Sequence, residues 1–278
     1  MFRNLIRLAI IPLMASSAAA PAQPVGAPPS APAATSTNAG QPSYVALVDL
    51  SLAAPVIVRA TITRSRRIAA SAAPGLAPGQ VRLLITATVD SALIAPDAIP
   101  RTLSWLQDVP PAARGRTPDL KGQSVLAWLR APSADGQTTL IAGNAAQPWS
   151  APLEARVRAI AAEIRTGNVP IITGVTNGFR VPGTVAGEAE SQFFLATRDN
   201  RPLTMVVLDR PGQQRQIQVA STDIIDESAT SVQPNTLLWY RLACALPARL
   251  PASAGGADQN LAQAWASAMA SLGPCNRQ

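Results

Sequence analysis

Side chains able to do acid–base or nucleophilic chemistry are scarce in this 278-residue sequence. Histidine is absent, which excludes a Ser-His-Asp triad, and no G-x-S-x-G motif is present. The single lysine, Lys121, precedes Ser124, which is the reverse of the S-x-x-K order. A serine hydrolase is therefore not expected, and we interpret Lys121 as a solvated turn residue before a strand.

Carboxylates offer a better route to catalysis, because a glycosidase-like site needs only an acid paired with a base or nucleophile. Glu188 and Glu190 flank one residue, so on a β-strand their side chains would share a face about 6–7 Å apart. A second acidic group contains Asp223, Asp226 and Glu227. Either group could equally be a solvated loop or a weak calcium site with oxygen ligands. Whether the protein is an enzyme stays open, with a non-catalytic role as the main hypothesis.

The role of the two cysteines, Cys244 and Cys275, depends on the compartment in which the protein folds. Residues 1–22 have the form of a signal peptide: Arg3 and Arg7 lie near the start, an apolar core follows, and small residues precede the cleavage site. The apolar core is too short for a membrane span. We therefore expect a periplasmic or secreted protein whose mature form has no span.

An oxidising compartment makes a Cys244–Cys275 disulfide the expected state of both thiols. A reactive thiol or a metal ligand is disfavoured, since there is no histidine and no second cysteine at metal-binding spacing. Before Cys275, the sequence predicts a helix that Asp258 caps and Gly273 ends. Segment 237–244 is predicted to be a core-facing strand that leads directly into the disulfide.

Arginine supplies all but one of the 23 basic side chains. The most basic stretch is 62–68, where Arg64 and Arg66 alternate onto one face of a predicted strand, with Arg82 on the next strand. Their guanidinium groups could bind phosphate or carboxylate groups of an anionic envelope polymer. The alternative is a solvated edge strand whose charges prevent aggregation.

The net charge of +7 falls to +5 once Arg3 and Arg7 leave with the signal peptide. Residues 43–168 hold 13 basic and 8 acidic side chains, whereas residues 169–278 hold 8 of each. This modest excess does not indicate nucleic-acid binding, and none is expected. Because the sequence has no glycine-rich phosphate loop, zinc-ligand spacing or EF-hand pattern, we expect no cofactor and no metal.

Composition divides the chain after the signal peptide into three parts. Residues 23–42 contain no charge, no aromatic residue and one bulky apolar side chain, Val25, so they cannot bury enough surface to offset the entropy of ordering. We interpret them as a flexible Pro/Ala-rich tether. The remainder suits two small domains, 43–168 and 169–278.

Alternation of apolar and polar residues predicts most of the first domain. Strands are expected over 55–63 and 80–94, and a hairpin over 123–143. A helix should run from a cap at Ser150 to a stop at Gly167. Short strands with one packing helix favour a small antiparallel barrel or sandwich.

The second domain is predicted in the same way. We expect a strand at 169–175, a hairpin over 191–209 and a further strand at 215–222. The five tryptophans are interpreted as core residues because each lies in or beside an apolar stretch: Trp105, Trp128, Trp149, Trp239 and Trp265.

Two resemblances rest on these segments. The paired strands, the segment LKGQSVLAWLRA and the closing helix resemble OB-type barrels of the netrin/TIMP-like kind, which bind protein partners or glycans. The resemblance implies an OB-like barrel, but the N-terminal cysteine on which inhibition by such domains depends is missing. The segments VPGTVAGEAESQFFL and TLLWYRLACALP resemble uncharacterised exported proteins of high-GC bacteria, over most of 170–275. That resemblance implies no particular activity.

Together these features predict a mainly β protein: a signal peptide, a tether and two small antiparallel β-barrel or sandwich domains, the first OB-like, each with one packing helix. The expected role is non-catalytic binding or structure in the bacterial envelope, with an anionic envelope polymer or an envelope protein as the partner of Arg64, Arg66 and Arg82. The alternative is a hydrolase of envelope glycan that uses Glu188 and Glu190. A subunit of a larger envelope complex is a third possibility.

Overall fold

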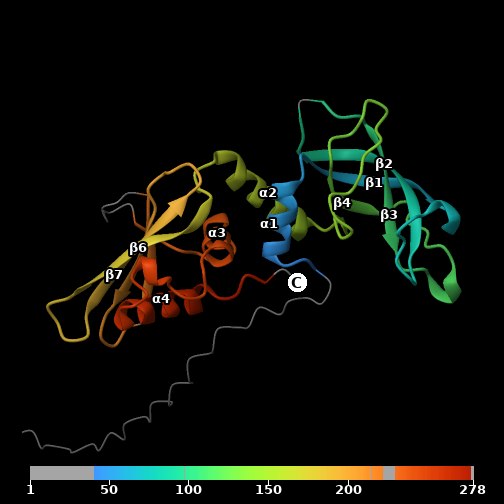
Figure 1. The fold of residues 1–278 in the computed structure, drawn as a ribbon. Helices are drawn as coiled ribbons and strands as arrows, with labels where there is room; N and C mark the ends of the chain where they lie inside the picture. Colours follow the sequence, from blue (N-terminus) through green and yellow to red (C-terminus); the bar gives the residue numbers. More distant parts are fainter. Residues whose placement is uncertain (1–40, 97, 214, 222–228, 277–278) are drawn as a thin grey trace, which may run out of the picture. The chain divides into compact units, whose positions relative to one another are not determined.

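Ten β-strands in two antiparallel sheets dominate the fold, together with four α-helices and three short 3-10 helices, in the part of the chain that the structure describes (Figure 1). The structure is a computed structural model, and it describes residues 41–278 except 97, 214, 222–228 and 277–278. The predicted mainly β fold with packing helices is therefore confirmed.

Three predicted features lie outside the described residues. They are the signal peptide at 1–22, all but the end of the tether at 23–42, and the acidic group of Asp223, Asp226 and Glu227. Both sheets belong to one compact unit, Gly40–Gln278.

The first sheet has the strand order β3-β2-β1-β4-β5. Its strands are β1 (Val56–Arg67), β2 (Val81–Ile94), β3 (Thr102–Val109), β4 (Ser124–Leu129) and β5 (Ala146–Pro148). Burial alternates along β2, as the sequence pattern predicts for a half-buried strand. The long β1 and β2 pair antiparallel over most of their length and form the centre of the sheet.

The predicted barrel does not close. The second half of the expected hairpin at 123–143 forms only isolated bridges: Ser104 of β3 donates to Gly136 O and accepts from Thr138 N–H, both at 2.9 Å. A Cβ at Gly136 would lie 2.2 Å from Thr102 O, so this close approach requires glycine. Because the bridges do not continue as a strand, the sheet remains open, and β5 pairs with β4 instead.

Apolar residues cover both faces of the first sheet. One face carries a cluster that includes the fully buried Leu83, Ile85 and Trp105. The other face packs Leu126 and Trp128 against helices α1 (Tyr44–Ala53) and α2 (Ala151–Thr166). Burial on both faces at β4 is consistent with the near-continuous apolar run SVLAWL of this strand.

The predicted helix at 150–167 is confirmed as α2. The Ser150 hydroxyl accepts from Leu153 N–H, and Gly167 ends the helix in the left-handed region at φ 62°. Helix α1 was not predicted, because seven of its ten residues are buried and its apolar side chains show no single stripe.

The second sheet has the order β10-β9-β8-β7-β6. Its strands are β6 (Ile172–Pro182), β7 (Ala189–Thr197), β8 (Thr204–Asp209), β9 (Gln216–Ala220) and β10 (Thr230–Ser231). The strands follow one another as an antiparallel meander, which confirms the predicted hairpin of β7 and β8.

Helices α3 (Leu237–Ala245) and α4 (Gln259–Leu272) pack on one face of the second sheet (Figure 1). In the core between them and the sheet, the rings of Phe193 and Trp265 meet edge-on at 5.0 Å. The predicted features of α4 are confirmed: Asp258 caps its start, and the helix ends at Gly273. None of the helices in the described residues has the length and apolar character needed to cross a membrane.

The strand predicted at 237–244 is wrong, because the segment forms helix α3. The Thr236 hydroxyl accepts from Trp239 N–H and caps the helix, which favours helical over extended backbone at this point. The disulfide is nevertheless present: Cys244, in the last turn of α3, bonds to Cys275, with 5.0 Å between the Cα atoms. Such a bond is typical of proteins that fold outside the reducing cytosol.

Replacing both cysteines (Cys244→Ser with Cys275→Ser) should lower the free energy of unfolding by about 3–4 kcal/mol, because the reduced chain regains the entropy of an open loop. Urea unfolding of the variant and the wild type measures this difference. A reductant should destabilise the wild type by the same amount and leave the variant unaffected. Equal unfolding midpoints for the wild type and the variant would contradict the prediction.

Candidate functional site

The three arginines predicted to bind an anion lie on one face of the first sheet. Arg64 pairs with Thr86 and Arg66 with Leu84 across β1 and β2. Directly paired residues share a face, and so do residues two apart on one strand, so Arg82 lies on this face as well. Arg64 and Arg66 are exposed and make no ion pair or side-chain hydrogen bond within the described part of the chain. We call this pair the Arg64–Arg66 face.

Arg82 differs from Arg64 and Arg66 because its guanidinium already binds a carboxylate of the protein, that of Asp108. Its Nε and Nη2 donate to the two oxygens of Asp108 at 2.7 and 2.8 Å, and Nη1 donates to Pro74 O at 2.9 Å. The hydrogen bonds from Arg82 hold the pKa of Asp108 below its usual value. A further anion would have to displace Asp108, so Arg82 is a less suitable contact than the sequence predicts.

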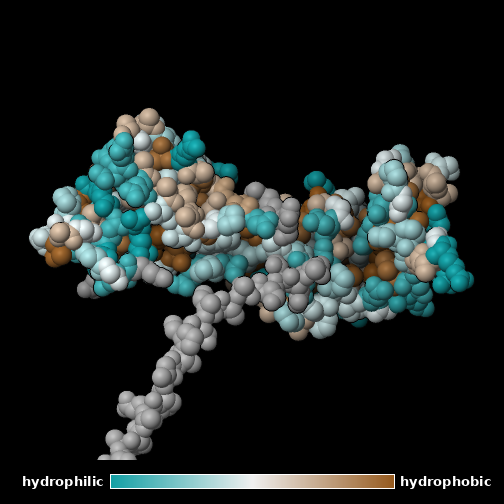
Figure 2. Space-filling model, turned by 90° about the horizontal axis from the view of Figure 1, so that it is seen from below, coloured by the Kyte–Doolittle hydropathy of each residue, from teal (hydrophilic) through white to brown (hydrophobic). Residues whose placement is uncertain are grey.

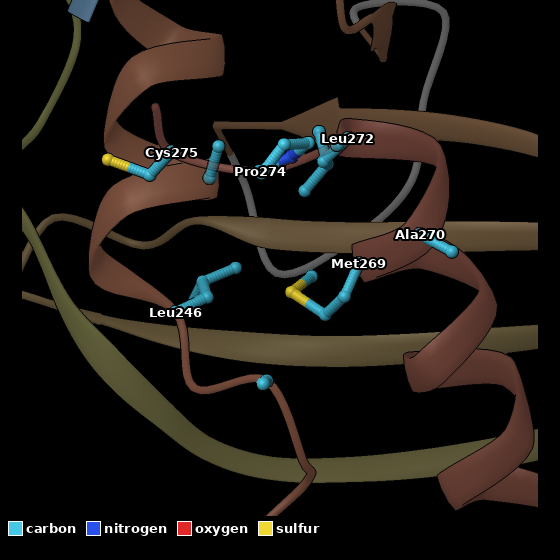
Figure 3. A pocket seen from close by; sticks show the side chains of 9 residues that line it. Leu246, Met269, Ala270, Leu272, Pro274 and Cys275 are labelled. Carbon is cyan, nitrogen blue, oxygen red and sulfur yellow. The ribbon is translucent and has the colours of Figure 1, made fainter. Parts of the chain in front are cut away.

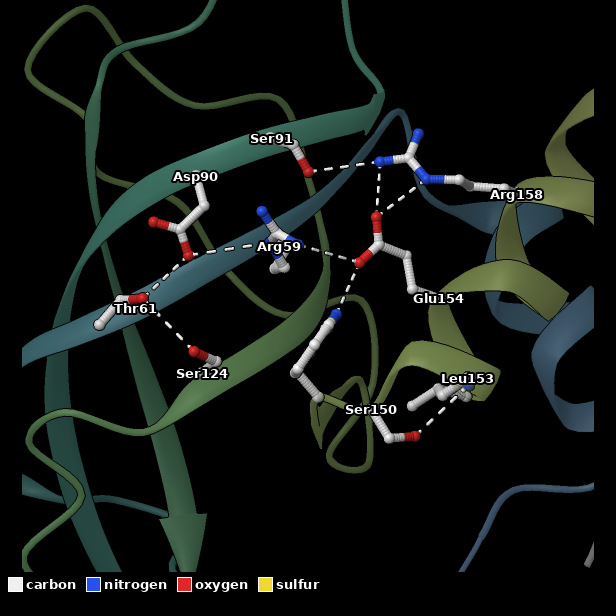
Figure 4. Close-up of polar contacts among 10 residues, drawn as sticks. Arg59, Thr61, Asp90, Ser91, Ser124, Ser150, Leu153, Glu154 and Arg158 are labelled. Atoms are coloured by element: carbon white, nitrogen blue, oxygen red, sulfur yellow. Dashed lines mark hydrogen bonds and ion pairs between the residues drawn. The ribbon is translucent and has the colours of Figure 1, made fainter.

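A network of paired charges lies where α2 meets the same sheet (Figure 4). The Glu154 carboxylate accepts from Trp149 Nε1 at 2.6 Å, from Arg158 at 2.6 and 2.9 Å, and from Arg59 at 3.4 Å. Arg59 also lies 4.0 Å from Asp90. Because each charged group faces an opposite charge, the network fixes α2 to β1 rather than offering a vacant binding site.

Trp149 is not a core residue, contrary to the prediction. It is 37% exposed, its indole lies 5.5 Å from the Arg59 guanidinium carbon, and it donates to Glu154. An indole with a polar edge suits such a half-exposed position. Trp105, Trp128 and Trp265 are fully buried, as predicted.

The reversed Lys121–Ser124 pair does not form a dyad. Lys121 is exposed in a turn, and its backbone N–H donates to Asp119. The Ser124 hydroxyl instead lies 3.5 Å from that of Thr61. Among the described residues, no group of three His, Cys, Asp or Glu side chains is placed to hold a metal ion.

The two glutamates of the alternative hypothesis line one recess of about 340 Å³ at an end of the second sheet. Glu190 lies on β7 and accepts from Gln192 at 2.6 Å, whereas Glu188 immediately precedes the strand. Arg210 also lines it. Asp209 lies at its edge, but the cross-strand register turns its carboxylate to the opposite face of the sheet from Glu190. We call this the acidic recess.

A second recess, which the sequence analysis missed, shares Asp209 and Arg210 with the first. It has a volume of about 380 Å³ and a mostly polar lining that includes Arg180 and Arg215. Asp209 is 8% exposed and accepts from Arg180 Nη1 at 2.6 Å on one oxygen and from Arg215 Nε on the other. We call this the basic recess. A charged residue at an inward-facing position of an apolar strand, as in LTMVVLD, is the signal that could have identified it.

An apolar pocket of about 440 Å³ lies between α3 and the end of α4, beside the disulfide. Leu246 and Met269 face each other across it (Figure 3). Elsewhere, exposed apolar side chains are interspersed with polar ones on the face seen in Figure 2. Exposed large apolar residues among the described ones include Phe179, Val181 and Val185 of the second sheet and its first connection.

No protein family model matches the chain, and no curated protein is similar to it. The two resemblances noted from the sequence therefore stay predictions, and the function has to be inferred from the geometry of the sites.

Glu154→Gln should lower the free energy of unfolding by about 1–3 kcal/mol at pH 7, because it removes the charge that three donors surround. The hydrogen bond from Trp149 and then those from Arg158 hold the pKa of Glu154 below its usual value. This stabilisation is therefore complete above the unfolded pKa of about 4.3 and is lost as the pH falls through the lower folded pKa.

Urea unfolding at pH 7 and pH 3 measures both effects. Glu188→Gln is the matched control, since the Glu188 carboxylate makes no hydrogen bond with the described residues. A difference between wild type and Glu154→Gln that persists unchanged at pH 3 would show that the charge is not responsible.

Proposed function

We propose that the protein is an exported, non-catalytic binding protein of the bacterial envelope that contacts an anionic envelope polymer through the Arg64–Arg66 face. The observation that carries this proposal is the contrast among the arginines on one face of the first sheet. Arg59 and Arg82 are tied to carboxylates, whereas Arg64 and Arg66 are exposed without one in the described chain. Their guanidinium groups are therefore free to bind a ligand.

The chemistry of the face suits an extended anion. Residues two apart on a strand lie about 6–7 Å apart, so Arg64 and Arg66 present two parallel sets of donors. Each guanidinium can form two hydrogen bonds to one carboxylate or phosphate group. The neighbouring Thr86, opposite Arg64, adds a hydroxyl to the same face. A polymer with repeated acidic groups can engage both arginines at once.

Export is supported by two independent features. The disulfide indicates an oxidising compartment outside the cytosol. The basic start, apolar core and small residues of the first 22 residues fit a signal peptide. Both agree with a partner in the periplasm or beyond.

The second candidate function is a carboxylate-dependent hydrolase of envelope glycan. The shared recess favours it, because Glu188 and Glu190 line one hollow. Two carboxylates beside one hollow are the minimum that glycoside hydrolysis requires.

Reversing the charge of the face with Arg64→Glu and Arg66→Glu should reduce retention on anionic envelope fractions about tenfold or more at low salt, because attraction becomes repulsion. Co-sedimentation measures the bound fraction. Arg101→Glu with Arg156→Glu is the matched control, since both of these arginines are exposed on the same half of the chain and the overall charge changes equally. If both double variants lose retention equally, net charge rather than this face is responsible.

A wall-digestion assay separates the two candidate functions. On the proposed function, neither the wild type nor Glu188→Gln releases soluble glycan from purified walls. Release by the wild type that Glu188→Gln abolishes would establish the hydrolase instead, because that substitution removes one ionisable carboxylate while preserving size.

A further inference from the structure

The basic recess lies at one end of the helix-covered face of the second sheet. Phe193 of β7 and Met205 of β8 are paired and belong to the core on this face. Ser191 lies two residues from Phe193, and Asp209 lies four residues from Met205, in the same direction along the sheet. Residues an even number apart on a strand share a face, so Ser191 and Asp209 continue the core face beyond its apolar part.

Two arginines approach Asp209 from the two strands that flank its neighbourhood. Arg180 pairs with Ser191 across β6 and β7, so it lies on the same face. Arg215 immediately precedes β9, on the other side of β8. Asp209 accepts from Arg180 Nη1 at 2.6 Å on one oxygen and from Arg215 Nε on the other. We call these three residues the Arg180–Asp209–Arg215 triad.

The triad carries one positive charge that no described residue balances. Two guanidinium groups against one carboxylate give it a formal charge of +1. The side chains of Arg180 and Arg215 are only 26% and 30% exposed, so water solvates this charge incompletely. Arg210 is exposed and also lines the acidic recess, so it is not counted. One singly charged anion in the recess would balance the triad.

Both guanidinium groups keep donors for such an anion. Arg180 uses one nitrogen, Nη1, for both Asp209 and Ser191, and Arg215 uses Nε for Asp209. A guanidinium has five N–H donors, so most donors of both groups are not used by the described residues. A carboxylate can accept two of them from one guanidinium in bidentate geometry. Because Asp209 already holds both arginines, less entropy is lost when a ligand binds.

The rest of the recess suits a polar ligand body. Its volume of about 380 Å³ exceeds what a lone carboxylate fills and lies in the range of small-molecule sites. Gln213 lines it, and its side-chain amide makes no hydrogen bond with the described residues, because only its backbone N–H is used, by Arg210 O. That amide can donate to and accept from hydroxyl groups. A mostly polar wall favours a hydroxylated body over a hydrocarbon one.

We propose that the basic recess binds a small hydroxylated carboxylic acid of the sugar-acid class. Its carboxylate lies on Arg180 and Arg215, and its hydroxyl groups face Gln213. The site uses only one face of the second sheet and does not depend on the Arg64–Arg66 face.

Isothermal titration calorimetry at constant ionic strength tests the site with D-glucuronate. D-glucose lacks the carboxylate, butyrate lacks the hydroxyl groups, and glucose 6-phosphate carries a doubly charged group instead. Glucuronate should bind about tenfold more tightly than glucose and than butyrate, because each lacks one set of contacts. Glucuronate binding no more tightly than glucose, or no binding at all, would overturn the proposal. Tighter binding of glucose 6-phosphate would overturn its assignment to a carboxylate.

Variants of the two arginines locate the bound carboxylate. Arg180→Gln and Arg215→Gln should each weaken glucuronate about tenfold, because each removes one charged set of donors. Arg249→Gln is the matched control, since Arg249 is an exposed arginine on the same half of the chain. Unchanged glucuronate binding by both triad variants would refute the assignment.

A measurement on the wild type covers the case in which a triad variant does not fold. Glucuronate should raise its urea unfolding midpoint, whereas glucose with sodium chloride at the same concentrations should not, because a ligand stabilises the folded state that binds it. Equal midpoints in both solutions would contradict the proposal. The Arg64→Glu, Arg66→Glu variant should bind glucuronate like the wild type, so failure of this site and failure of the polymer-binding face are separate results.

Discussion

Trp239 is the side chain on which two apolar clusters of the described chain converge. It packs against the cluster beneath the second sheet and against the cluster formed by α1, α2 and the first sheet. Its ring meets Tyr44 edge-on with 6.1 Å between centroids, and Nε1 donates to Leu272 O at 2.7 Å. A large aromatic ring with a satisfied N–H contributes strongly to a core. The position of α3, which carries this residue, therefore determines how both clusters are completed.

Polar contacts and one covalent bond hold α3 in that position. Glu163 of α2 accepts from Leu237 N–H at 2.7 Å, and Tyr240 donates to Asp49 of α1 at 2.5 Å. A helix of nine residues is marginal by itself, so these tertiary contacts rather than local propensity stabilise it. Tyr44 of α1 lowers the stability of this region, because its buried hydroxyl has no hydrogen-bond partner among the described residues. The same burial raises the pKa of the Tyr44 hydroxyl. An unsatisfied buried hydroxyl costs about 1–3 kcal/mol, and the packing of the Tyr44 ring on Trp239 opposes this cost.

The sequence predicted correctly the elements whose local patterns are strong, such as capped helices and alternating strands. Helices α2 and α4 have a side-chain cap at one end and glycine at the other, and β1 and β2 alternate clearly, so their existence and approximate bounds were predictable. Helices α1 and α3 are apolar on most sides, and such short runs fit a strand or a helix equally well. Tertiary burial and the Thr236 cap decide the outcome for α3. Closure of the first sheet depends on where residues 136–138 lie against β3, which no local pattern encodes.

The candidate sites were harder to predict because the pairing of arginine with carboxylate is a property of the register between strands. Arg82 meets Asp108 across β2 and β3, and Arg180 reaches Asp209 across β7. These partners are 26 and 29 residues apart in the chain, and a single sequence does not reveal the contacts. The net charge of +7 is consequently a poor guide to anion binding. The anion binding proposed here requires guanidinium groups that keep unused donors, because fully paired ones would first have to release a carboxylate.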